Sequence, residues 1–515
     1  MATGMLTNDT DLAREGQDAG PKWQTALVWI VIVGLLMVAI GMRLYQLGAP
    51  IERDYDEGVY WQSMRAMGAG YSLYQQVFYS QPPFFLLELY PLFTLFGGTL
   101  GAARFGIVLL SLPGFVGALL LGRALHGRLG ALVAVLLLVV SPIFLVESRV
   151  VQADAPSAAL SLLAVGLIFT WWEHPDGRAG LCWAVLSGVL LTLSILCKLL
   201  VAATVIPAGL LILLRLVQIW KRQPGTGRRS LVPIVAGIIA CIVTALLLLL
   251  PFLGTYHTFI QMVVTFHTAA SSTFAYTRGM NFQVIGRELF TPLGLAALYG
   301  TLIAVIRLDM RVLPLVAWLF GTVLLLKQQL PLFPHHLVAL APPLIALATL
   351  GIGEVPAFER LGQYRRRLPR ATKILAAVLL LLVVGLAIQK DYQYYVGVPW
   401  YAASGVVQRD LRIAGDLRNA ITPAEQVVTD EQFMAGLADR TTPPDLVDTS
   451  NVRITTGYLT LQQLEAISLQ PQVHAVLFFS GRFRGLPPTK GYHTWVTQHF
   501  HLLHDYGNGQ ELWVR

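Results

Sequence analysis

The segment 48–81 carries three acidic residues within four positions, Asp54, Asp56 and Glu57. Carboxylates this close repel one another, which raises the pKa of one of them or attracts a cation. A carboxylate can act as general base on a hydroxyl, so Asp56 and Glu57 are candidate catalytic residues. The alternative is structural: Asp54 or Asp56 would cap a helix N-terminus, and Glu57 in the first turn would suit the helix dipole. The two roles are compatible.

A second acid, Asp154, stands at the start of an apolar block, shortly after Arg149. At that place Asp154 would either cap a helix or present a carboxylate to a site. Arg149 can pair with Asp154 or with an acid of the segment 48–81. We therefore treat both residues as candidate site residues.

Cationic and imidazole side chains recur in other polar segments. Lys198 interrupts an apolar stretch, where Lys is costly and usually functional, although its ammonium could instead snorkel to the membrane surface. His267 and Arg278 lie in a long polar loop, and His335 and His336 precede another apolar block. A single His is more often structural than a ligand. Adjacent helical residues point in different directions, so we expect at most one of the last two to face a shared cavity.

Membrane-spanning helices must position these residues. The chain is 55% hydrophobic and 13% charged, whereas soluble chains carry about 25% charged residues. Its apolar residues form blocks near or above the ~18–20 residues that cross a bilayer, which predicts about eleven spans. The three cysteines lie within these blocks, so we expect no disulfide. The predicted spans are 25–47, 102–123, 129–147, 155–172, 180–197, 199–219, 231–252, 285–306, 312–326, 336–353 and 373–389.

Basic residues orient these spans. With a cytosolic N-terminus, the loops on the cytosolic side are rich in Lys and Arg, including Arg365-Arg366-Arg367, as the positive-inside rule requires. The net charge of +8 then indicates membrane orientation rather than nucleic-acid binding. The apolar block 82–96 is short and begins with two prolines, so we expect an interfacial helix on the outer side.

Residues 390–515 follow another pattern, in which short strands alternate with helices. Strands are expected at 426–429, 446–448, 473–479 and 510–514, and helices at 431–438 and 459–468. This order predicts a small parallel α/β domain. The expected fold class is an all-α polytopic membrane protein with a small C-terminal α/β domain. Its parts are a cytosolic tail (1–24), a membrane domain (25–389) and an extracytoplasmic domain (390–515).

All the candidate acids and cations fall on the outer face in this topology. An outer cavity lined by carboxylates and cations suits a substrate with an anionic head and a lipid tail. A carboxylate would activate a hydroxyl nucleophile, and the cations would stabilise a phosphate leaving group.

The layout and short motifs of roughly residues 25–390 resemble the GT-C membrane glycosyltransferases that use polyprenyl-phosphate sugars. These include the protein O-mannosyltransferases and the aminoarabinose transferases of lipid A. The residues that carry the resemblance are Asp56-Glu57 with Tyr60, Tyr74 through Gln81-Pro82-Pro83, Arg149 to Asp154, Lys198, and Pro334-His335-His336 followed by Ala341-Pro342-Pro343.

The resemblance implies an inverting transfer of a sugar from a polyprenyl phosphate, without a nucleotide, to a hydroxyl of a glycolipid, glycan or protein at the cell membrane. Asp56 would be the base that activates this hydroxyl. The expected catalytic residues are Asp56, Glu57 and Asp154. The expected substrate-binding residues are Tyr60, Arg65, Gln81, Arg149, Lys198, His267, Arg278, His335 and His336.

Ser80-Gln81 stands where aminoarabinose transferases have Glu-Lys, which argues against aminoarabinose and lipid A as substrates. The phosphate contacts must then come from elsewhere, and we expect Lys198 and Arg278 to make them. The three catalytic candidates could jointly hold Mg²⁺ or Mn²⁺, as in the oligosaccharyltransferases. The members nearest this pattern generally work without a metal, so we expect none.

A transporter or flippase for a lipid-linked anionic substrate is the main alternative function. Transporters often show internal repeats and broken helices at the midplane. This sequence has no such symmetry, and its charged residues gather toward one face.

Overall fold

The computed structural model describes residues 22–49, 54–220, 227–351 and 370–515. Most of the expected cytosolic tail 1–24 and the basic run Arg365-Arg366-Arg367 lie outside these residues.

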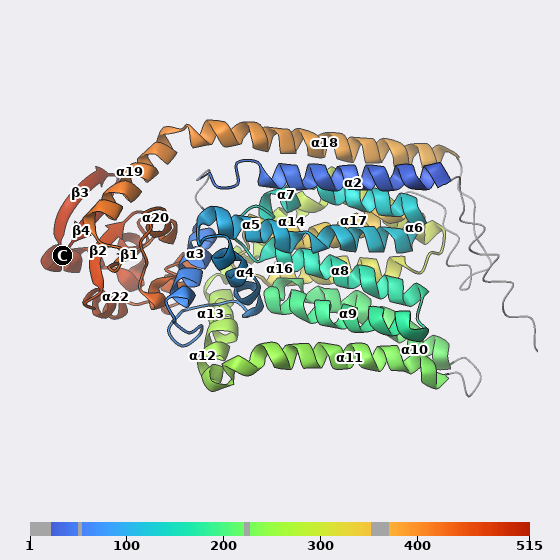
Figure 1. The fold of residues 1–515 in the computed structure, drawn as a ribbon, viewed down its shortest axis with the longest axis horizontal. Coiled ribbons are helices and arrows are strands. Elements are labelled where there is room, and N and C mark those ends of the chain that lie inside the picture. Colours follow the sequence, from blue (N-terminus) through green and yellow to red (C-terminus); the bar gives the residue numbers. More distant parts are fainter. Residues whose placement is uncertain (1–21, 50–53, 221–226, 352–369) are drawn as a thin grey trace, which may run out of the picture.

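A bundle of apolar helices runs along the long axis of the molecule (Figure 1). Helices form here because a backbone within a membrane must satisfy its hydrogen bonds internally. The bundle contains α2 (Lys22–Leu44), α5 (Leu100–Ser111), α6 (Pro113–Val139), α7 (Pro142–Glu147), α8 (Asp154–Glu173), α9 (Gly177–Cys197), α10 (Val205–Trp220), α11 (Gly227–Leu249), α14 (Arg278–Leu289), α15 (Pro292–Ile306), α16 (Val312–Gln328), α17 (Ala341–Leu350) and α18 (Arg370–Ala402).

Among the described residues, seven helices are long and apolar enough to cross a membrane, or eight if the bent pair α14 and α15 is one span. Shorter apolar helices include Val312–Gln328 and Pro334–Leu350. The longest apolar stretches include Leu100–Val139, in which the chain reverses at Gly127, whose φ is +60°. Within the described residues the predicted spans fall mostly on helices, but 129–147 is interrupted between Val139 and Pro142, 285–306 is bent by 76°, and 336–353 is described only to residue 351.

Small residues let neighbouring helices of the bundle approach closely. A Cβ atom on Gly117 of α6 would lie 2.4 Å from the backbone nitrogen of Leu163 in α8. A Cβ atom on Gly166 of α8 would lie 2.7 Å from the carbonyl oxygen of Gly117. Backbone contact of this kind is typical of helix packing in membranes, and it fixes the start of α8, where Asp154 lies.

Short elements cover one end of the bundle (Figure 1). The helix α4 (Phe84–Leu95) occupies the block predicted to be interfacial, and it buries Phe85, Leu86, Leu89 and Phe93. The other elements of this region are α3 (Tyr55–Gly68), η1 (Leu199–Thr204), η2 (Leu250–Thr255), α12 (Tyr256–Ile260), the π-helical turn η3 (Gln261–Thr265), α13 (Phe266–Thr273), η4 (Ala275–Thr277) and the 3₁₀ helix η5 (Pro334–Leu340).

The C-terminal domain lies beyond these elements (Figure 1). Helix α18 continues past the expected boundary at residue 389 to Ala402, and α19 (Gly405–Ala420) leads into the domain. The sheet contains β1 (Gln426–Thr429), β2 (Val473–Phe478), β3 (His501–Gly507) and β4 (Gln510–Val514) in the order β1-β2-β4-β3. Its helices are α20 (Gln432–Leu437), η6 (Pro444–Leu446), α21 (Asn451–Thr455), α22 (Leu461–Ser468), α23 (Arg482–Gly485), η7 (Pro487–Thr489) and α24 (Tyr492–His499).

The sheet corrects two predictions. Only β1 and β2 are parallel, because β4 pairs antiparallel with both β2 and β3. The segment 446–448 ends a 3₁₀ turn and is not a strand, whereas the mostly exposed strand β3 was missed. Strand β2 was predicted because Ala475 and Leu477 pack on one face while Val476 and Phe478 pack on the other, which gives a continuous apolar run.

Candidate active site

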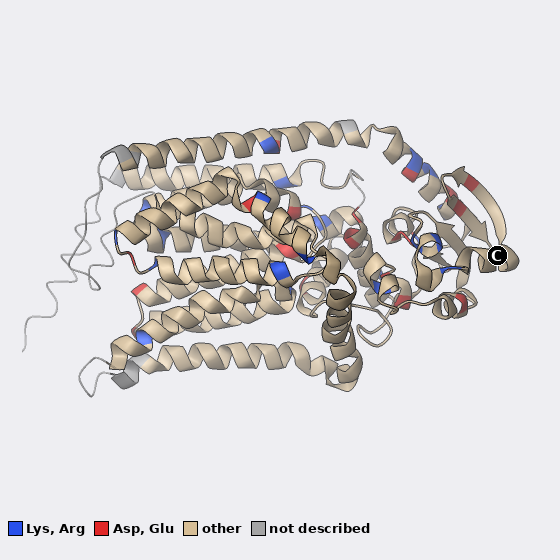
Figure 2. Cartoon of the chain, turned by 180° about the vertical axis from the view of Figure 1, so that it is seen from behind, with Lys and Arg blue, Asp and Glu red and all other residues tan. Residues whose placement is uncertain are grey.

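A cavity of about 390 Å³ lies where the bundle meets the C-terminal domain. Figure 2 shows charged residues gathered around this junction, while the helices between the two ends of the bundle are largely uncharged. The lining comes from α3, the segment before α4, Lys198, α13, the loop into η5 and the C-terminal domain. The predicted site residues among the lining are Asp56, Tyr60, Gln81, Lys198, His267, His335 and His336.

The first turn of α3 presents Asp56 to this cavity. Asp54 caps the helix, because its carboxylate accepts a hydrogen bond from the Glu57 backbone N–H at 3.0 Å. The capping role considered for this acidic cluster therefore belongs to Asp54, which leaves the Asp56 carboxylate available. Its Oδ2 atom lies 3.6 Å from His335 Nε2, and 40% of the side-chain surface is open to the cavity.

Burial within the protein is the largest cause that raises the pKa of Asp56 from 3.8 to about 8. The neighbouring charge of Asp54 is next and also raises this pKa, Lys198 lowers it, and the charges of Asp448 and Asp154 raise it further. A carboxyl group with a pKa near the working pH is well suited to accept a proton from a hydroxyl.

Lys198 lies at the break between α9 and η1, where its backbone is extended (φ −155°, ψ 125°). Its Nζ atom is 2.5 Å from Asp154 Oδ2, and both side chains are almost fully buried. Asp154 is the first residue of α8 but makes no capping bond, since Ala153 is the N-cap. Lys198 therefore does not snorkel to the membrane surface, and Asp154 does not cap its helix. The two side chains bind each other instead.

Both His335 and His336 line the cavity, contrary to the expectation that only one would. They lie in the first turn of η5, and their ring centroids are 4.4 Å apart. Side chains of a first helical turn lean toward the N-terminus, here toward the cavity, which explains the shared orientation. The Phe333 N–H donates to His336 Nδ1 at 3.2 Å, so the proton of the neutral ring is on Nε2.

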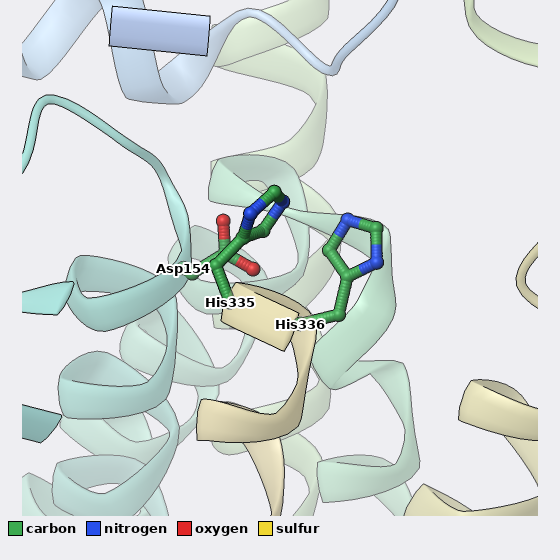
Figure 3. Close-up of side chains that lie close together, drawn as sticks. All are labelled: Asp154, His335 and His336. Atoms are coloured by element: carbon green, nitrogen blue, oxygen red, sulfur yellow. The ribbon is translucent and has the colours of Figure 1, made fainter. Parts of the chain in front are cut away.

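Asp154, His335 and His336 each offer one ligand atom, and these atoms lie within 4.8 Å of one another (Figure 3). A carboxylate and two imidazoles suit a transition metal. The Asp154 carboxylate is already paired with Lys198, however, and a bound metal ion would repel that ammonium. The donor set is therefore suited to a metal in its residue types but not in its charge balance.

Glu57 makes structural contacts instead of lining the cavity. Its carboxylate is fully buried and accepts two hydrogen bonds from Arg104, from Nε at 2.7 Å and from Nη2 at 2.6 Å. It also accepts one from the Val151 N–H at 3.0 Å. The metal set considered from sequence, Asp56 with Glu57 and Asp154, is not assembled. Both oxygens of the Glu57 carboxylate are bonded to Arg104, so neither is available to share a metal with the other two acids.

Three predicted cations also lie away from the cavity. Arg65 pairs with Asp439 of the C-terminal domain. Arg149 donates to the Tyr45 carbonyl and stacks on two tyrosine rings of α18, and it makes no ion pair with Asp154 or with a described acid of the segment 48–81. Arg278 is exposed at the start of α14 and is not part of the cavity lining, which removes it as a phosphate contact.

The remaining predicted residues lie in the lining. Tyr60 packs edge-on against Phe85, with ring centroids 4.9 Å apart. Gln81 lines the cavity, and its carbonyl accepts a hydrogen bond from Tyr74 at 2.7 Å. His267 Nε2 donates to the Ser80 carbonyl at 2.7 Å.

The lining residues that sequence reasoning missed include Tyr55, Asp448 and Arg482. The latter two come from the C-terminal domain, and no local pattern marked them. Arg104, the partner of Glu57, could have been found, because it is a lone charge in an apolar block.

Comparisons with known proteins agree with this architecture. The family model of dolichyl-phosphate-mannose-protein mannosyltransferases matches residues 80–246. Among solved structures, ArnT from Cupriavidus metallidurans bound to undecaprenyl phosphate matches with a TM-score of 0.61 and 16% identity, over 94% of this chain and 97% of that protein. The chain has the GT-C fold. The same protein in the apo state matches with a TM-score of 0.60 and 14% identity, over 95% and 98% of the two chains.

A more distant GT-C structure is the Archaeoglobus fulgidus oligosaccharyltransferase in the apo form, with a TM-score of 0.50 and 12% identity. The match covers 91% of this chain and 71% of that protein. A comparison with curated protein sequences gives no match. The GT-C likeness thus extends over the membrane bundle and the C-terminal domain together.

Proposed function

We propose that this chain is an inverting glycosyltransferase that moves a sugar from a polyprenyl phosphate to an acceptor hydroxyl on the outer face of the membrane. The observation that carries the proposal is the placement of the open Asp56 carboxylate in one cavity with Lys198. The names of the matching proteins, a dolichyl-phosphate-mannose transferase family and an undecaprenyl-phosphate-bound ArnT, support a lipid-phosphate donor.

Asp56 is the proposed general base. Its carboxylate takes the proton of the acceptor hydroxyl as the oxygen attacks the anomeric carbon of the donor. The carbon–oxygen bond to phosphate breaks on the opposite side of the ring, so a single displacement inverts the configuration. Within the described part of the chain, His335 at 3.6 Å is the one ion-pair partner that Asp56 would have to release first.

Lys198 and the histidines are the proposed stabilisers of the leaving phosphate. The Lys198 ammonium is held in place by Asp154, so it is preorganised for the charge that develops on the leaving oxygen. His336 presents its Nε2–H, because Nδ1 is occupied by the Phe333 N–H. Lys198 thus keeps the role expected from sequence, and the histidines take the place of Arg278.

We further propose that the reaction uses no divalent metal. Lys198 already neutralises Asp154, and Arg104 neutralises Glu57. The Lys198 ammonium would stabilise the leaving lipid phosphate, which is the role that a metal ion has in a metal-dependent enzyme.

A transporter function has less support from the same geometry. The cavity lies at one end of the bundle beneath the C-terminal domain, whereas transporter sites lie near the midplane. The positive-inside rule, applied to the basic loops predicted to be cytosolic, supports the outer side for this end of the bundle and for the C-terminal domain.

The test is incubation of the purified full-length protein in lipid nanodiscs with undecaprenyl-phosphate-linked mannose, glucose or arabinose. Free undecaprenyl phosphate is measured by mass spectrometry, and the Asp56→Asn variant is the matched control. We expect release with at least one donor and little with the variant. Equal release by both proteins, or none with any donor, would overturn the proposal.

A further inference from the structure

The C-terminal domain supplies one wall of the cavity. The segment after η6 contributes Asp448, Ser450, Asn451 and Val452, and the start of α23 contributes Arg482. Asp56 and Tyr60 of α3 line the same cavity, so this wall and the proposed base share it. A substrate that loses a proton to Asp56 would therefore contact this wall.

Hydrogen bonds fix this wall relative to the proposed base. Tyr55, the neighbour of Asp56, donates to Asp448 Oδ1 at 3.1 Å and accepts from the Thr449 N–H at 2.6 Å. Gln62, further along α3, donates to the Arg440 carbonyl at 3.1 Å and accepts from the Thr442 N–H at 3.2 Å. These bonds therefore join the helix that carries the base to the wall.

The backbones of the two parts also touch. A Cβ atom on Gly58 would lie 2.3 Å from the Phe433 backbone nitrogen, and one on Gly436 would lie 2.4 Å from the Trp61 ring. Only glycine permits this approach. The docking of the domain on α3 is therefore part of the fold.

The charged groups of this wall are already engaged. Asp448 Oδ1 accepts from Tyr55 and from the Ser450 N–H at 2.8 Å. Arg482 stacks on the Tyr55 ring at 3.9 Å, donates to the Asp430 carbonyl and lies 3.7 Å from Glu431. The wall therefore offers no excess positive charge to an anionic ligand.

The other groups around the wall are neutral. Asn451 is exposed, and its amide carries both a donor and an acceptor, whereas the Ser450 hydroxyl accepts from the Arg453 N–H at 3.1 Å and keeps its O–H as a donor. Phe333 lines the same cavity and is exposed, so it presents aromatic surface, while Tyr79 lines the cavity but is buried. Neutral two-way hydrogen-bonding groups beside aromatic rings match the alternating hydroxyl and C–H faces of a sugar.

We propose that the C-terminal domain forms the acceptor subsite and that the acceptor is the hydroxyl of an uncharged carbohydrate. This inference rests on the proposed function and names its acceptor class. The acceptor O–H bond breaks and its proton goes to the Asp56 carboxylate. The oxygen bonds to the anomeric carbon of the donor, and the polyprenyl phosphate leaves with the electrons of the broken bond.

The test compares three classes of acceptor probe in nanodiscs with the active donor: octyl glucoside and octyl mannoside as neutral sugars, octyl glucuronide as an anionic sugar, and a Ser/Thr-containing hexapeptide. We expect transfer to a neutral glycoside. Transfer only to the glucuronide or only to the peptide would overturn the acceptor class. Turnover of the donor to free sugar, with transfer to none of the probes, would overturn this inference while leaving the donor chemistry intact. Absence of any donor turnover would instead refute the proposed function.

The residue-level test is Asn451→Ala, with Asn419→Ala on the exposed face of α19 as the matched control. Loss of the amide hydrogen bonds should raise the KM for the glycoside about tenfold. The KM for the donor should change less than twofold, and the control should leave both constants unchanged. An unchanged glycoside KM in Asn451→Ala, or an equal rise in both constants, would overturn the subsite.

Discussion

The pH dependence of sugar transfer gives the sharpest test of Asp56. Its pKa is raised to about 8, and only the ionised carboxylate can accept a proton. Activity should therefore rise with pH. From that pKa the ionised fraction is about 1% at pH 6, about 9% at pH 7 and about 50% at pH 8, which is a roughly 50-fold increase. With the usual value of 3.8, the fraction would already exceed about 99% at pH 6 and the profile would be flat.

The assay is a single-turnover measurement of sugar transfer, with enzyme in excess over donor, between pH 6 and pH 8.5. Single turnover isolates the chemical step from product release. Asp56→Asn removes the base and should lower the rate by about 10²- to 10⁴-fold, and the residual rate should not vary with pH. A flat profile for the unmodified protein would refute the raised pKa of the base. A variant that keeps the rising profile would show that another group titrates.

Four further predictions follow from the contacts of the site. Lys198→Ala should weaken donor binding more than acceptor binding, measured as separate KM values, and an unchanged donor KM would remove its phosphate role. Arg104→Leu leaves a buried charge on Glu57 and should cost about 3–5 kcal/mol of stability, seen as a lower thermal midpoint, which Arg104→Leu/Glu57→Leu should largely restore. Gly58→Ala should loosen the C-terminal domain, because the added Cβ would overlap Phe433, and faster proteolytic release of the domain would report this. The control is Gly415→Ala in α19. Gly70, which follows α3, is not suited as a control, since its φ is +89°. EDTA should leave transfer unchanged, and loss of activity that Zn²⁺ or Mg²⁺ restores would contradict the metal-free mechanism.

The sequence was sufficient for the membrane bundle because its signal is local. Each span is marked by a run of apolar residues, and the bilayer thickness sets the length of that run. The bend between α14 and α15 was not foreseen, because Thr291 caps a new helix inside an apolar block. The strand β3 was missed for the opposite reason: its residues are mostly exposed, so it lacks the apolar alternation of a half-buried strand.

The site was only partly predictable because half of it depends on distant contacts. Asp56, Lys198 and His335 could be found as polar residues next to apolar blocks. The position of Arg278 could not be judged, since a loop residue on the correct side of the membrane can still point away from the cavity. The wall from the C-terminal domain, with Asp448 and Arg482, depends on docking across nearly four hundred positions of sequence, as the contact of Tyr55 with Asp448 illustrates.

The two adjacent acids at the start of α3 show how the structural and chemical interpretations combine. Glu57 Oε1 accepts from both Arg104 of α5 and the Val151 N–H, just ahead of Asp154. This buried carboxylate therefore ties α3 to the bundle and to the segment that carries the second acid. Successive helical residues point about 100° apart, so anchoring Glu57 in the bundle directs its neighbour Asp56 toward the cavity. The acidic pair thus supplies a structural anchor and a proposed base from one helical turn, and loss of the anchor should misplace the base even though the Asp56 carboxylate remains.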